Sequence, residues 1–338
     1  MKKSHNLWIR AWYGKSRWVY ALLPLSWLFA AVSKLRKFLY VQFLQQNFSV
    51  PIIVVGNISV GGTGKTPLII ALAKYLQARG YKPGVISRGY GGKAPNYPYV
   101  LNEQTSAAEA GDEPLLIYRS AQCPVCVAPD RVAAARELIH LGCTHILSDD
   151  GLQHYRLGRA MEIAVVDGQR LFGNRKQLPA GPLREPVARL KKVDFIIINQ
   201  RATTRSLSGK ECLSGFHNLY TMKIQPQAWC QLGSQQEFEL NGVDMRAPIH
   251  AVAGIGNPER FFNTLDELDL HYYAHHFSDH HQFTAEDFAT FGNDRVVMTE
   301  KDAVKCYSFA KPGWYSLIIS AYLSTGFWQS FQQKLDSL

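Results

Sequence analysis

The sequence has few cysteines for its length, and this excludes a fold held together by disulfide bonds. Six cysteines are spread over 338 residues, whereas small secreted domains carry a dense, even set. The one close pair, Cys123-Pro-Val-Cys126, is not followed by a second CxxC or by histidines at zinc-ligand spacing. The pattern favours a protein of a reducing compartment without a structural zinc ion.

Acidic residues are also scarce. The chain has 27 Asp and Glu against 37 Lys and Arg, which gives a net charge of +10. Such an excess favours an acidic partner, whether a nucleic acid, a phosphate ligand or an anionic membrane, and charge alone does not choose among them. Hydrophobic residues make up 46% of the chain, so a disordered polypeptide is excluded and a large core, divided over two domains, is expected.

An uninterrupted apolar run long enough to cross a bilayer is missing too. The longest run near the N-terminus extends from Trp18 to Val32, about 15 residues, and Pro24 and Ser26 interrupt it. A spanning helix needs roughly 18 to 20 residues. Spanning is therefore the weaker interpretation of residues 1–45.

The same run is amphipathic and has basic flanks, which predicts a helix lying in the membrane interface. Lys and Arg precede and follow it, and its apolar residues repeat at helical spacing. A secretory signal and a helix packed on the domain core are the alternatives. The expected apolar stripe consists of Trp18, Leu22, Leu25, Phe29 and Val32.

A glycine-rich segment follows the first β-branched strand and precedes a helical pattern. This strand, loop and helix order is the context of a P-loop, in which backbone N–H groups and the helix N-terminus surround phosphate oxygens. Lys65 is placed to reach the β and γ phosphates, and the Thr66 hydroxyl to bind Mg²⁺. Ser59 departs from the common pattern, which has glycine there. The predicted nucleotide-binding residues are Ser59, Gly61, Gly62, Thr63, Gly64, Lys65 and Thr66.

Two adjacent acids follow another apolar strand, as expected for the carboxylate that completes a P-loop magnesium site. They are Asp149 and Asp150, and an exposed acidic turn is the alternative. Neighbouring residues on a strand point in opposite directions, so the sequence does not say which of the two contacts the metal.

Two further segments lie where strand ends and helix starts face a ligand. Arg88 and Tyr90 follow a predicted strand, and Arg88 is suited to bind a phosphate group. Asp112 and Glu113 open an apolar segment, where an acid can accept the proton of an attacking hydroxyl or simply cap a helix.

These motifs, taken together and in order, resemble the tetraacyldisaccharide 4'-kinase family, the lipid A 4'-kinases of Gram-negative bacteria. The likeness extends from the N-terminal arm to about residue 306. Its segments are Ser59-Val-Gly-Gly-Thr-Gly-Lys-Thr66, Ser87-Arg-Gly-Tyr-Gly91, Ala110-Gly-Asp-Glu-Pro114, Ser148-Asp-Asp-Gly-Leu-Gln-His154, Leu178-Pro-Ala-Gly-Pro-Leu-Arg-Glu-Pro186, Phe277-Ser-Asp-His-His-Gln-Phe283 and Val297-Met-Thr-Glu-Lys-Asp-Ala-Val-Lys305.

The resemblance implies transfer of phosphate from MgATP to the 4' hydroxyl of a tetraacylated glucosamine disaccharide 1-phosphate, at the cytoplasmic face of the inner membrane. It implies Asp112 as catalytic base, His280 as its partner and Lys65 as the cation on the migrating phosphoryl group. We expect ATP and Mg²⁺ as cofactors, a lipid A precursor and an anionic membrane as partners, no nucleic acid, and a monomer. The resemblance also implies that Gln153, His154, Arg184 and Glu185 line the cleft with Arg88, Tyr90 and Glu113.

The expected fold is α/β: a P-loop NTPase-like domain with a mostly parallel sheet, a second smaller α/β domain, and an N-terminal membrane-associated helix. We predict an arm at residues 1–45, a P-loop domain at 46–210, a β-rich linker at 211–245 and a C-terminal domain at 246–338 that closes over the cleft. The segment around Gly254 and Gly256 imitates a dinucleotide fingerprint, but a glutamate replaces its third glycine.

The alternative function is a membrane-associated P-loop switch NTPase without lipid phosphotransfer. Its guanine form is disfavoured, because Asn199-Gln200-Arg201-Ala202 lacks the Lys and Asp of the Asn-Lys-x-Asp pattern that reads guanine. A basic binding protein with a non-functional glycine loop is the second alternative. Phosphorylation of a lipid-linked sugar would separate the kinase from both.

Overall fold

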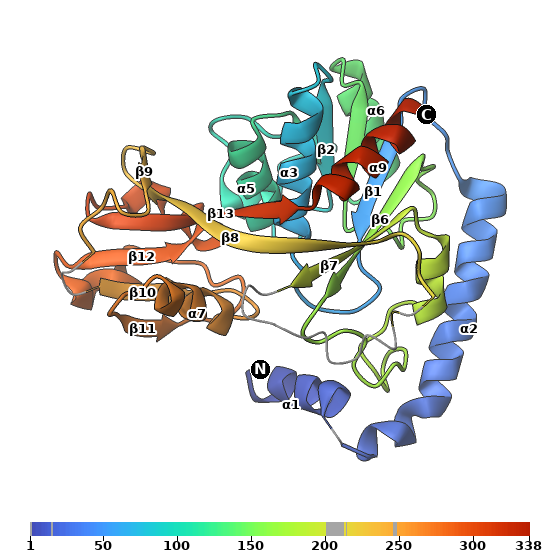
Figure 1. Cartoon of the computed structure of the whole chain (residues 1–338), viewed down its shortest axis with the longest axis horizontal. Helices are drawn as coiled ribbons and strands as arrows, with labels where there is room; N and C mark the ends of the chain where they lie inside the picture. The colour runs from blue at the N-terminus through green and yellow to red at the C-terminus, as the bar shows by residue number, and fades with distance from the viewer. Residues whose placement is uncertain (1, 15, 201–212, 214, 246–248) are drawn as a thin grey trace.

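The computed structural model describes residues 2–14, 16–200, 213, 215–245 and 249–338 (Figure 1). The expected boundary between residues 210 and 211, and the expected start of the second α/β unit at 246–248, lie outside this part of the chain.

One mixed sheet runs through the described chain, with strand order β11-β10-β12-β13-β8-β7-β6-β1-β5-β2-β4-β3 and β9 paired with β8. Most neighbouring strands are parallel, and the pairs β13–β8, β8–β9 and β3–β4 are antiparallel. The strands are β1 (Ile52–Gly56), β2 (Pro83–Ser87), β3 (Tyr99–Val100), β4 (Val125–Val127), β5 (His145–Asp149), β6 (Met161–Asp167), β7 (Phe195–Gln200), β8 (Leu219–Gln231), β9 (Glu237–Glu239), β10 (Ile249–Ala253), β11 (Tyr273–His276), β12 (Arg295–Thr299) and β13 (Trp314–Leu323).

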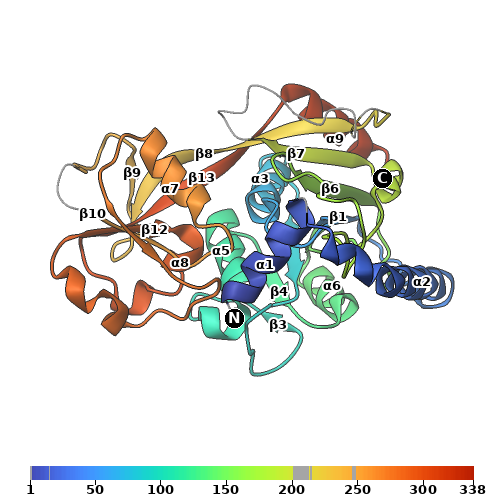
Figure 2. The ribbon, with the colours of Figure 1, turned by 90° about the horizontal axis from the view of Figure 1, so that it is seen from below.

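Helices cover this sheet on both faces (Figures 1 and 2). The α-helices are α1 (Lys2–Tyr13), α2 (Leu23–Leu39), α3 (Lys65–Gln77), α4 (Ala107–Ala110), α5 (Asp112–Ala121), α6 (Arg131–His140), α7 (Glu259–Glu267), α8 (Glu300–Ala303) and α9 (Thr325–Asp336). Shorter helical turns are η1 (Trp18–Leu22), η2 (Tyr40–Leu44), η3 (Val187–Lys192), η5 (Ala285–Phe291) and η6 (Tyr307–Phe309).

Strand β1 shows why the first half of the sheet is buried on both faces. Its side chains alternate, so Ile53 and Val55 pack with α3, α5 and α9, whereas Ile52 and Val54 pack with α6. A continuous run of β-branched residues is typical of such a strand. The mostly parallel α/β fold expected from the sequence is confirmed.

The linker predicted at 211–245 contains a long strand, β8, which pairs with β7 on one side and with β13 on the other. The β8–β13 ladder extends from Met222 opposite Leu323 to Gln231 opposite Tyr315, with an irregularity between Ile318 and Ile319. This antiparallel pair carries the sheet from the first half into the second (Figure 1). The domain division itself stays a prediction.

The last helix, α9, packs on the first half of the sheet rather than on the second. Phe327 and Phe331 contact Phe195 of β7, and Trp328 stacks on Tyr75 of α3 with ring centroids 4.2 Å apart. The final residues of the C-terminal segment at 246–338 therefore complete the core around the P-loop helix.

Helical structure continues from Trp18 to Leu44 through η1, α2 and η2. Its 27 residues are long and apolar enough to cross a membrane by length and composition, so the helix is longer than the run of about 15 apolar residues suggested. Val19 is buried, and Ser26 Oγ binds the carbonyl of Gln177 and the amide of Ala180 at 2.9 and 3.0 Å. These contacts attach the helix to the domain.

The apolar side chains of this helix are largely exposed. In the predicted stripe Trp18, Leu25 and Val32 face outward, whereas Leu22 and Phe29 are half-buried. The exposed face continues with Leu35, Leu39 and Phe43, the last of which is 73% exposed. Such a surface is typical of a membrane-contacting helix.

Candidate active site

The glycine-rich loop connects β1 to α3 at the carboxyl edge of the parallel strands. Gly64 has φ +94°, and a Cβ there would lie 2.5 Å from Asn199 Nδ2. Asn199, at the end of β7, donates a hydrogen bond from this nitrogen to the Thr63 carbonyl at 3.0 Å. Glycine is required here by both the left-handed backbone and the approach of Asn199. The sequence did not predict this role of Asn199.

The first part of the loop is held by a second segment, and this accounts for the unusual Ser59. Ser59 is buried and forms a β-bridge with Leu183, and the Val60 amide donates to the Pro182 carbonyl at 2.9 Å. The segment before Arg184 thus takes part in shaping the phosphate loop.

Asp149 and Asp150 have different environments at the end of β5. Asp149 is buried, accepts a hydrogen bond from Ser87 Oγ at 3.1 Å, and leaves its Oδ1 without a hydrogen-bond partner among the described residues. Burial, followed by the charge of Glu113, raises the pKa of Asp149. A buried carboxylate oxygen with no donor is suited to a cation.

Asp150 leaves the strand with φ +47° and interacts with two cations. Its carboxylate lies 3.4 Å from Lys65 Nζ and 2.9 Å from Arg184 Nη1. Burial works to raise the pKa of Asp150, but the charges of Lys65 and Arg184 outweigh it and lower the pKa to about 2. The two acids, which the sequence left unranked, thus occupy distinct positions.

Asp112 is the first residue of α5 and is 2% exposed. Its Oδ2 lies 3.0 Å from His280 Nδ1 and 3.7 Å from Lys305 Nζ. Burial alone would raise the pKa of Asp112, but the hydrogen bond from His280 and the charge of Lys305 lower it. The Asp112–His280 pair that the resemblance implies is therefore assembled in this structure.

Two lysines, Lys301 of α8 and Lys305 just after this helix, surround the pair. Lys301 Nζ lies 3.0 Å from Glu113 Oε1, 3.7 Å from Asp279 Oδ1 and 3.5 Å from His280 Nε2. Lys305 is almost completely buried and also contacts Asp302 at 2.7 Å. Both lysines lie in the family-like segment Val297–Lys305, but the sequence predicts no role for either of them.

The backbone around Tyr90 brings the end of β2 against the start of α5. Gly111 has φ +88°, and a Cβ there would lie 2.6 Å from the Tyr90 carbonyl oxygen. The exposed Tyr90 ring is 5.4 Å from the His280 ring. Tyr90 and Glu113 therefore border the Asp112–His280 pair. Arg88 is exposed and makes no hydrogen bond or ion pair with Asp112 or His280.

The remaining predicted residues form two groups. Gln153 Nε2 donates to Glu185 Oε1 at 2.8 Å and to the Asn57 carbonyl at 3.1 Å, and Arg184 bridges Gln153 and Asp150. His154 instead lines a cavity of about 230 Å³ together with residues of α2 and α6. Burial, then the positive charges of neighbouring arginines, lowers the pKa of His154 to about 4.

Arg131, at the start of α6, lines the His154 cavity and was not predicted. Its side chain is buried and donates to the Asp149 carbonyl at 3.0 Å. Burial lowers the pKa of Arg131 to about 10, which leaves it charged at neutral pH. It connects this cavity to the acid pair at the end of β5.

A glycine-rich loop at the carboxyl edge of a parallel sheet, with a lysine, a buried acid at its side and a separate carboxylate–imidazole pair, defines a P-loop phosphotransferase. The chain matches the family described as tetraacyldisaccharide-1-P 4'-kinase over residues 18–336 and belongs to that family.

Relatives of known assignment agree over almost the whole chain. The tetraacyldisaccharide 4'-kinase of Legionella pneumophila (strain Lens) is 44% identical over 95% of this chain and 95% of its own length. That of Aeromonas salmonicida is 47% identical over 97% and 96%. A crystal structure of LpxK from Aquifex aeolicus, described as an apo form in complex with ATP, matches with a TM-score of 0.75 and 26% identity, over 94% of this chain and 98% of that one.

Proposed function

We propose that this chain transfers the γ-phosphate of ATP to the 4' hydroxyl of a tetraacylated glucosamine disaccharide 1-phosphate, a step of lipid A biosynthesis. Family membership supports the reaction, and the buried Asp112–His280 pair beside the P-loop edge is the structural observation that carries it. A switch NTPase needs only to activate water. A carboxylate–imidazole pair that joins Asp112 of the first half of the sheet to His280 of the second half therefore favours a separate alcohol acceptor.

The P-loop supplies the ATP site. Its backbone N–H groups and the start of α3 surround phosphate oxygens, and Lys65 carries the charge that stabilises the migrating phosphoryl group. Lys65 pairs with Asp150 at 3.4 Å in this structure. A phosphate group of ATP would therefore compete for Lys65 with the Asp150 carboxylate, which also pairs with Arg184. The ATP complex of the Aquifex aeolicus relative supports this assignment.

Mg²⁺ fits the residues present between α3 and β5. The Thr66 hydroxyl and the unpartnered Oδ1 of the buried Asp149 are oxygen donors of the kind Mg²⁺ prefers. The described residues contain no group of three or more His, Cys, Asp or Glu that could hold a metal, which agrees with an ion held mainly by the nucleotide phosphates. Bound there, Mg²⁺ would neutralise charge on the phosphates.

Asp112 acts as the base in the proposed reaction. Its carboxylate accepts the proton of the 4' hydroxyl while the hydroxyl oxygen forms a bond to the γ-phosphorus and ADP leaves with the electrons of the broken P–O bond. His280 donates from Nδ1 to Asp112 Oδ2 at 3.0 Å and so fixes the orientation of the carboxylate. The lowered pKa keeps Asp112 ionised at neutral pH.

The acceptor would bind along the polar residues around this pair. We assign Arg88, Tyr90 and Glu113 to its sugar and phosphate groups, and Gln153, Arg184 and Glu185 to the cleft beside Asp150. His154 was expected in the same cleft, but it lines a neighbouring cavity with Arg131. The exposed apolar face of residues 18–44 supports a position at the cytoplasmic face of the inner membrane, where the acyl chains of the substrate remain in the bilayer.

The test is an Asp112→Asn variant assayed with labelled ATP, Mg²⁺ and the disaccharide lipid. Loss of a general base lowers kcat roughly 10²- to 10⁴-fold while ATP binding persists, and Lys65→Ala abolishes transfer. Asp336→Asn, at the exposed end of α9, serves as the matched control. Near-normal labelling of the lipid by Asp112→Asn, or ATP hydrolysis that ignores added lipid, would contradict the proposal.

A further inference from the structure

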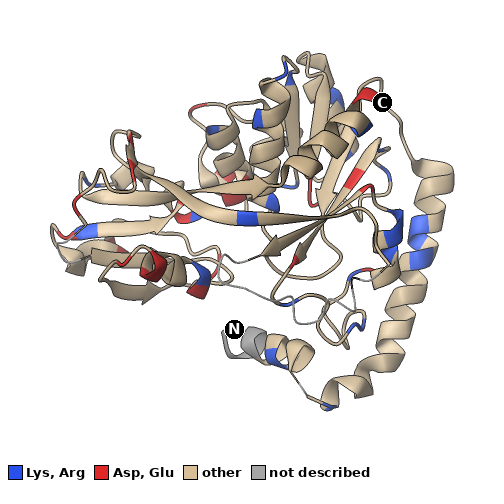
Figure 3. Ribbon diagram, in the orientation of Figure 1, with Lys and Arg blue, Asp and Glu red and all other residues tan. Residues whose placement is uncertain are grey.

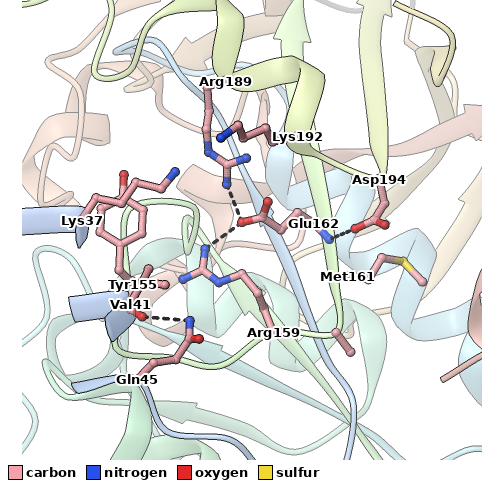
Figure 4. Close-up of a pocket in the computed structure, with 11 residues that line it drawn as sticks. Lys37, Val41, Gln45, Tyr155, Arg159, Met161, Glu162, Arg189, Lys192 and Asp194 are labelled. Carbon is pink, nitrogen blue, oxygen red and sulfur yellow. Dashed lines mark hydrogen bonds and ion pairs between the residues drawn. The ribbon is translucent and has the colours of Figure 1, made fainter. Parts of the chain in front are cut away.

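A second polar cavity lies under the end of the N-terminal helix, away from the nucleotide loop. It has a volume of about 270 Å³ and is enclosed by α2 and η2, by the start of β6 and by η3 (Figure 4). The P-loop follows the carboxyl end of β1, whereas this cavity lies at the amino end of β6. Seven residues of strand separate the two edges by about 20 Å, so the cavity does not belong to the site described above.

The walls of this cavity carry excess positive charge. Glu162 is paired with Arg159 at 2.9 Å and Arg189 at 2.5 Å, and Lys37 and Arg189 share Glu185 at 3.6 and 3.2 Å. Asp194 is neutralised by Lys334 at 3.0 Å.

Lys192 lines the same cavity and forms no ion pair with a carboxylate in the described part of the chain. The cavity walls therefore carry more positive than negative charges. Burial, then the charge of Arg189, lowers the pKa of Lys37, and these two effects outweigh the opposite effect of Glu185.

The mouth of the cavity is continuous with the apolar face of the helix. Val41 lines the cavity and is 41% exposed, and Phe38 and Phe43 on the same helical stretch are more exposed still. Helix α2 carries Lys34, Arg36 and Lys37 near its end and no acidic residue (Figure 3). A ligand with an anionic head and apolar chains would satisfy both surfaces at once.

We propose that this cavity binds the headgroup of an anionic membrane glycerophospholipid, with its acyl chains along Phe38, Val41 and Phe43. The proposal deepens the membrane location given above and rests on it. The phosphodiester would lie between Lys37, Arg189 and Lys192, while Tyr155 and Gln45 provide the remaining polar wall. The site takes a structural lipid, not the disaccharide, and it adjoins the assigned acceptor cleft at Glu185, which meets Gln153 on one side and Lys37 and Arg189 on the other.

The two lysines that end η3 provide a matched test. Lys191 and Lys192 are adjacent and both exposed, but only Lys192 lines the cavity. Flotation of the full-length protein is measured with phosphatidylcholine vesicles that contain 0 or 30% phosphatidylglycerol, and retained lipid is counted by native mass spectrometry after transfer to detergent. Neither measurement contains ATP or disaccharide, so the outcome is independent of phosphotransfer.

Lys192→Glu should lower affinity for phosphatidylglycerol vesicles about fivefold or more, since one basic residue at an anionic surface contributes about that factor. It should also lose the retained phosphatidylglycerol molecule, whereas Lys191→Glu keeps it. Equal losses in both variants, or no retained lipid in the unmodified protein, would overturn the site and leave only diffuse attraction to the surface. Displacement of the lipid by millimolar inorganic phosphate would assign the cavity to free phosphate and likewise overturn the proposal.

Discussion

At the scale of single residues, Lys305 is, after His280, the side chain that most lowers the pKa of the base. It lies 3.7 Å from Asp112 and 2.7 Å from Asp302, with 1% of its side chain exposed. Its charge is one cause of the lowered pKa of Asp112. Removing the charge should therefore raise that pKa and move the acid limb of kcat/KM to higher pH.

The variant for this prediction is Lys305→Met combined with Asp302→Asn, because Lys305→Met alone leaves a buried carboxylate without its cation. The expected result is activity lost at a higher pH than in the unmodified enzyme as the pH falls, with Lys305→Arg retaining most of the original profile. The pH dependence of kcat/KM provides the measurement. An unchanged acid limb in the double variant would remove Lys305 from any role in positioning or charging Asp112.

The sequence predicts which residues lie together best where they belong to a short motif, although their roles stay predictions. Lys65 and the loop glycines are contiguous, and Asp149 follows a recognisable strand, so their placement at one edge of the sheet could be expected. The contacts of Asn199 and Arg131 could not, because no motif of fixed spacing joins them to their partners. Lys305 lies in the family-like segment Val297–Lys305, but nothing in the sequence places it beside Asp112. Their contacts depend on tertiary structure alone.

At the scale of elements, helix α8 connects the second half of the sheet to the base. Its first residue, Glu300, accepts a hydrogen bond from the Ile319 amide at 3.0 Å, beside the irregularity in β13. Burial raises the pKa of Glu300 to about 7. Because the folded protein then binds this proton more tightly than the unfolded chain does, Glu300 makes stability fall as the pH rises from about 4.5 to about 7.

Glu300→Gln should remove this dependence while keeping an oxygen for the Ile319 amide. The variant is expected to melt a few degrees higher than the unmodified protein at pH 8 and at a similar temperature at pH 5. Thermal unfolding at the two pH values, with exposed Glu286→Gln as control, measures the difference. If Glu300→Gln changes the melting temperature by the same amount at pH 5 and at pH 8, ionisation of Glu300 does not affect stability and the prediction is wrong.

Element boundaries were predicted best where hydrophobic periodicity is local. The strand, glycine-rich loop and helix of residues 52–77 follow from such patterns. The sequence predicts a β-rich linker at 211–245 but does not predict that one strand continues past Pro226, since proline normally interrupts a central strand. In the structure the β8–β13 register shifts between Ile318 and Ile319, opposite this point, and β8 continues to Gln231.

At the scale of the whole molecule, the exposed face of the N-terminal helix predicts how the enzyme is held at the bilayer. Leu28, Val32 and Leu35 lie on this face, and none of them is buried against the domain. Changing all three to Glu should reduce partitioning into lipid vesicles more than tenfold, because each buried aliphatic side chain contributes about 1.5 to 3 kcal/mol. Phosphorylation of a detergent-dispersed acceptor should fall much less.

Vesicle flotation measures the partitioning, and circular dichroism confirms that the triple variant is folded. The exposed Leu141, at the end of α6, gives a control when changed to Glu. Unchanged flotation of the triple variant would reject this face as the membrane contact. The length of the helix was not predictable from the apolar run, because Lys34, Arg36 and Lys37 interrupt the hydrophobic pattern before the helix continues to Leu44.

The return of α9 to the first half of the sheet constrains how the chain is made. Phe327, Phe331 and Leu335 belong to the same buried cluster as Ile53 and Leu72, about 260 residues earlier in the chain. The part of this face next to Phe195 therefore stays uncovered until α9 has been synthesised, although α3 and α5 cover the rest of it. The nascent chain exposes these apolar side chains until then, and removal of α9 would leave them in contact with water and favour aggregation.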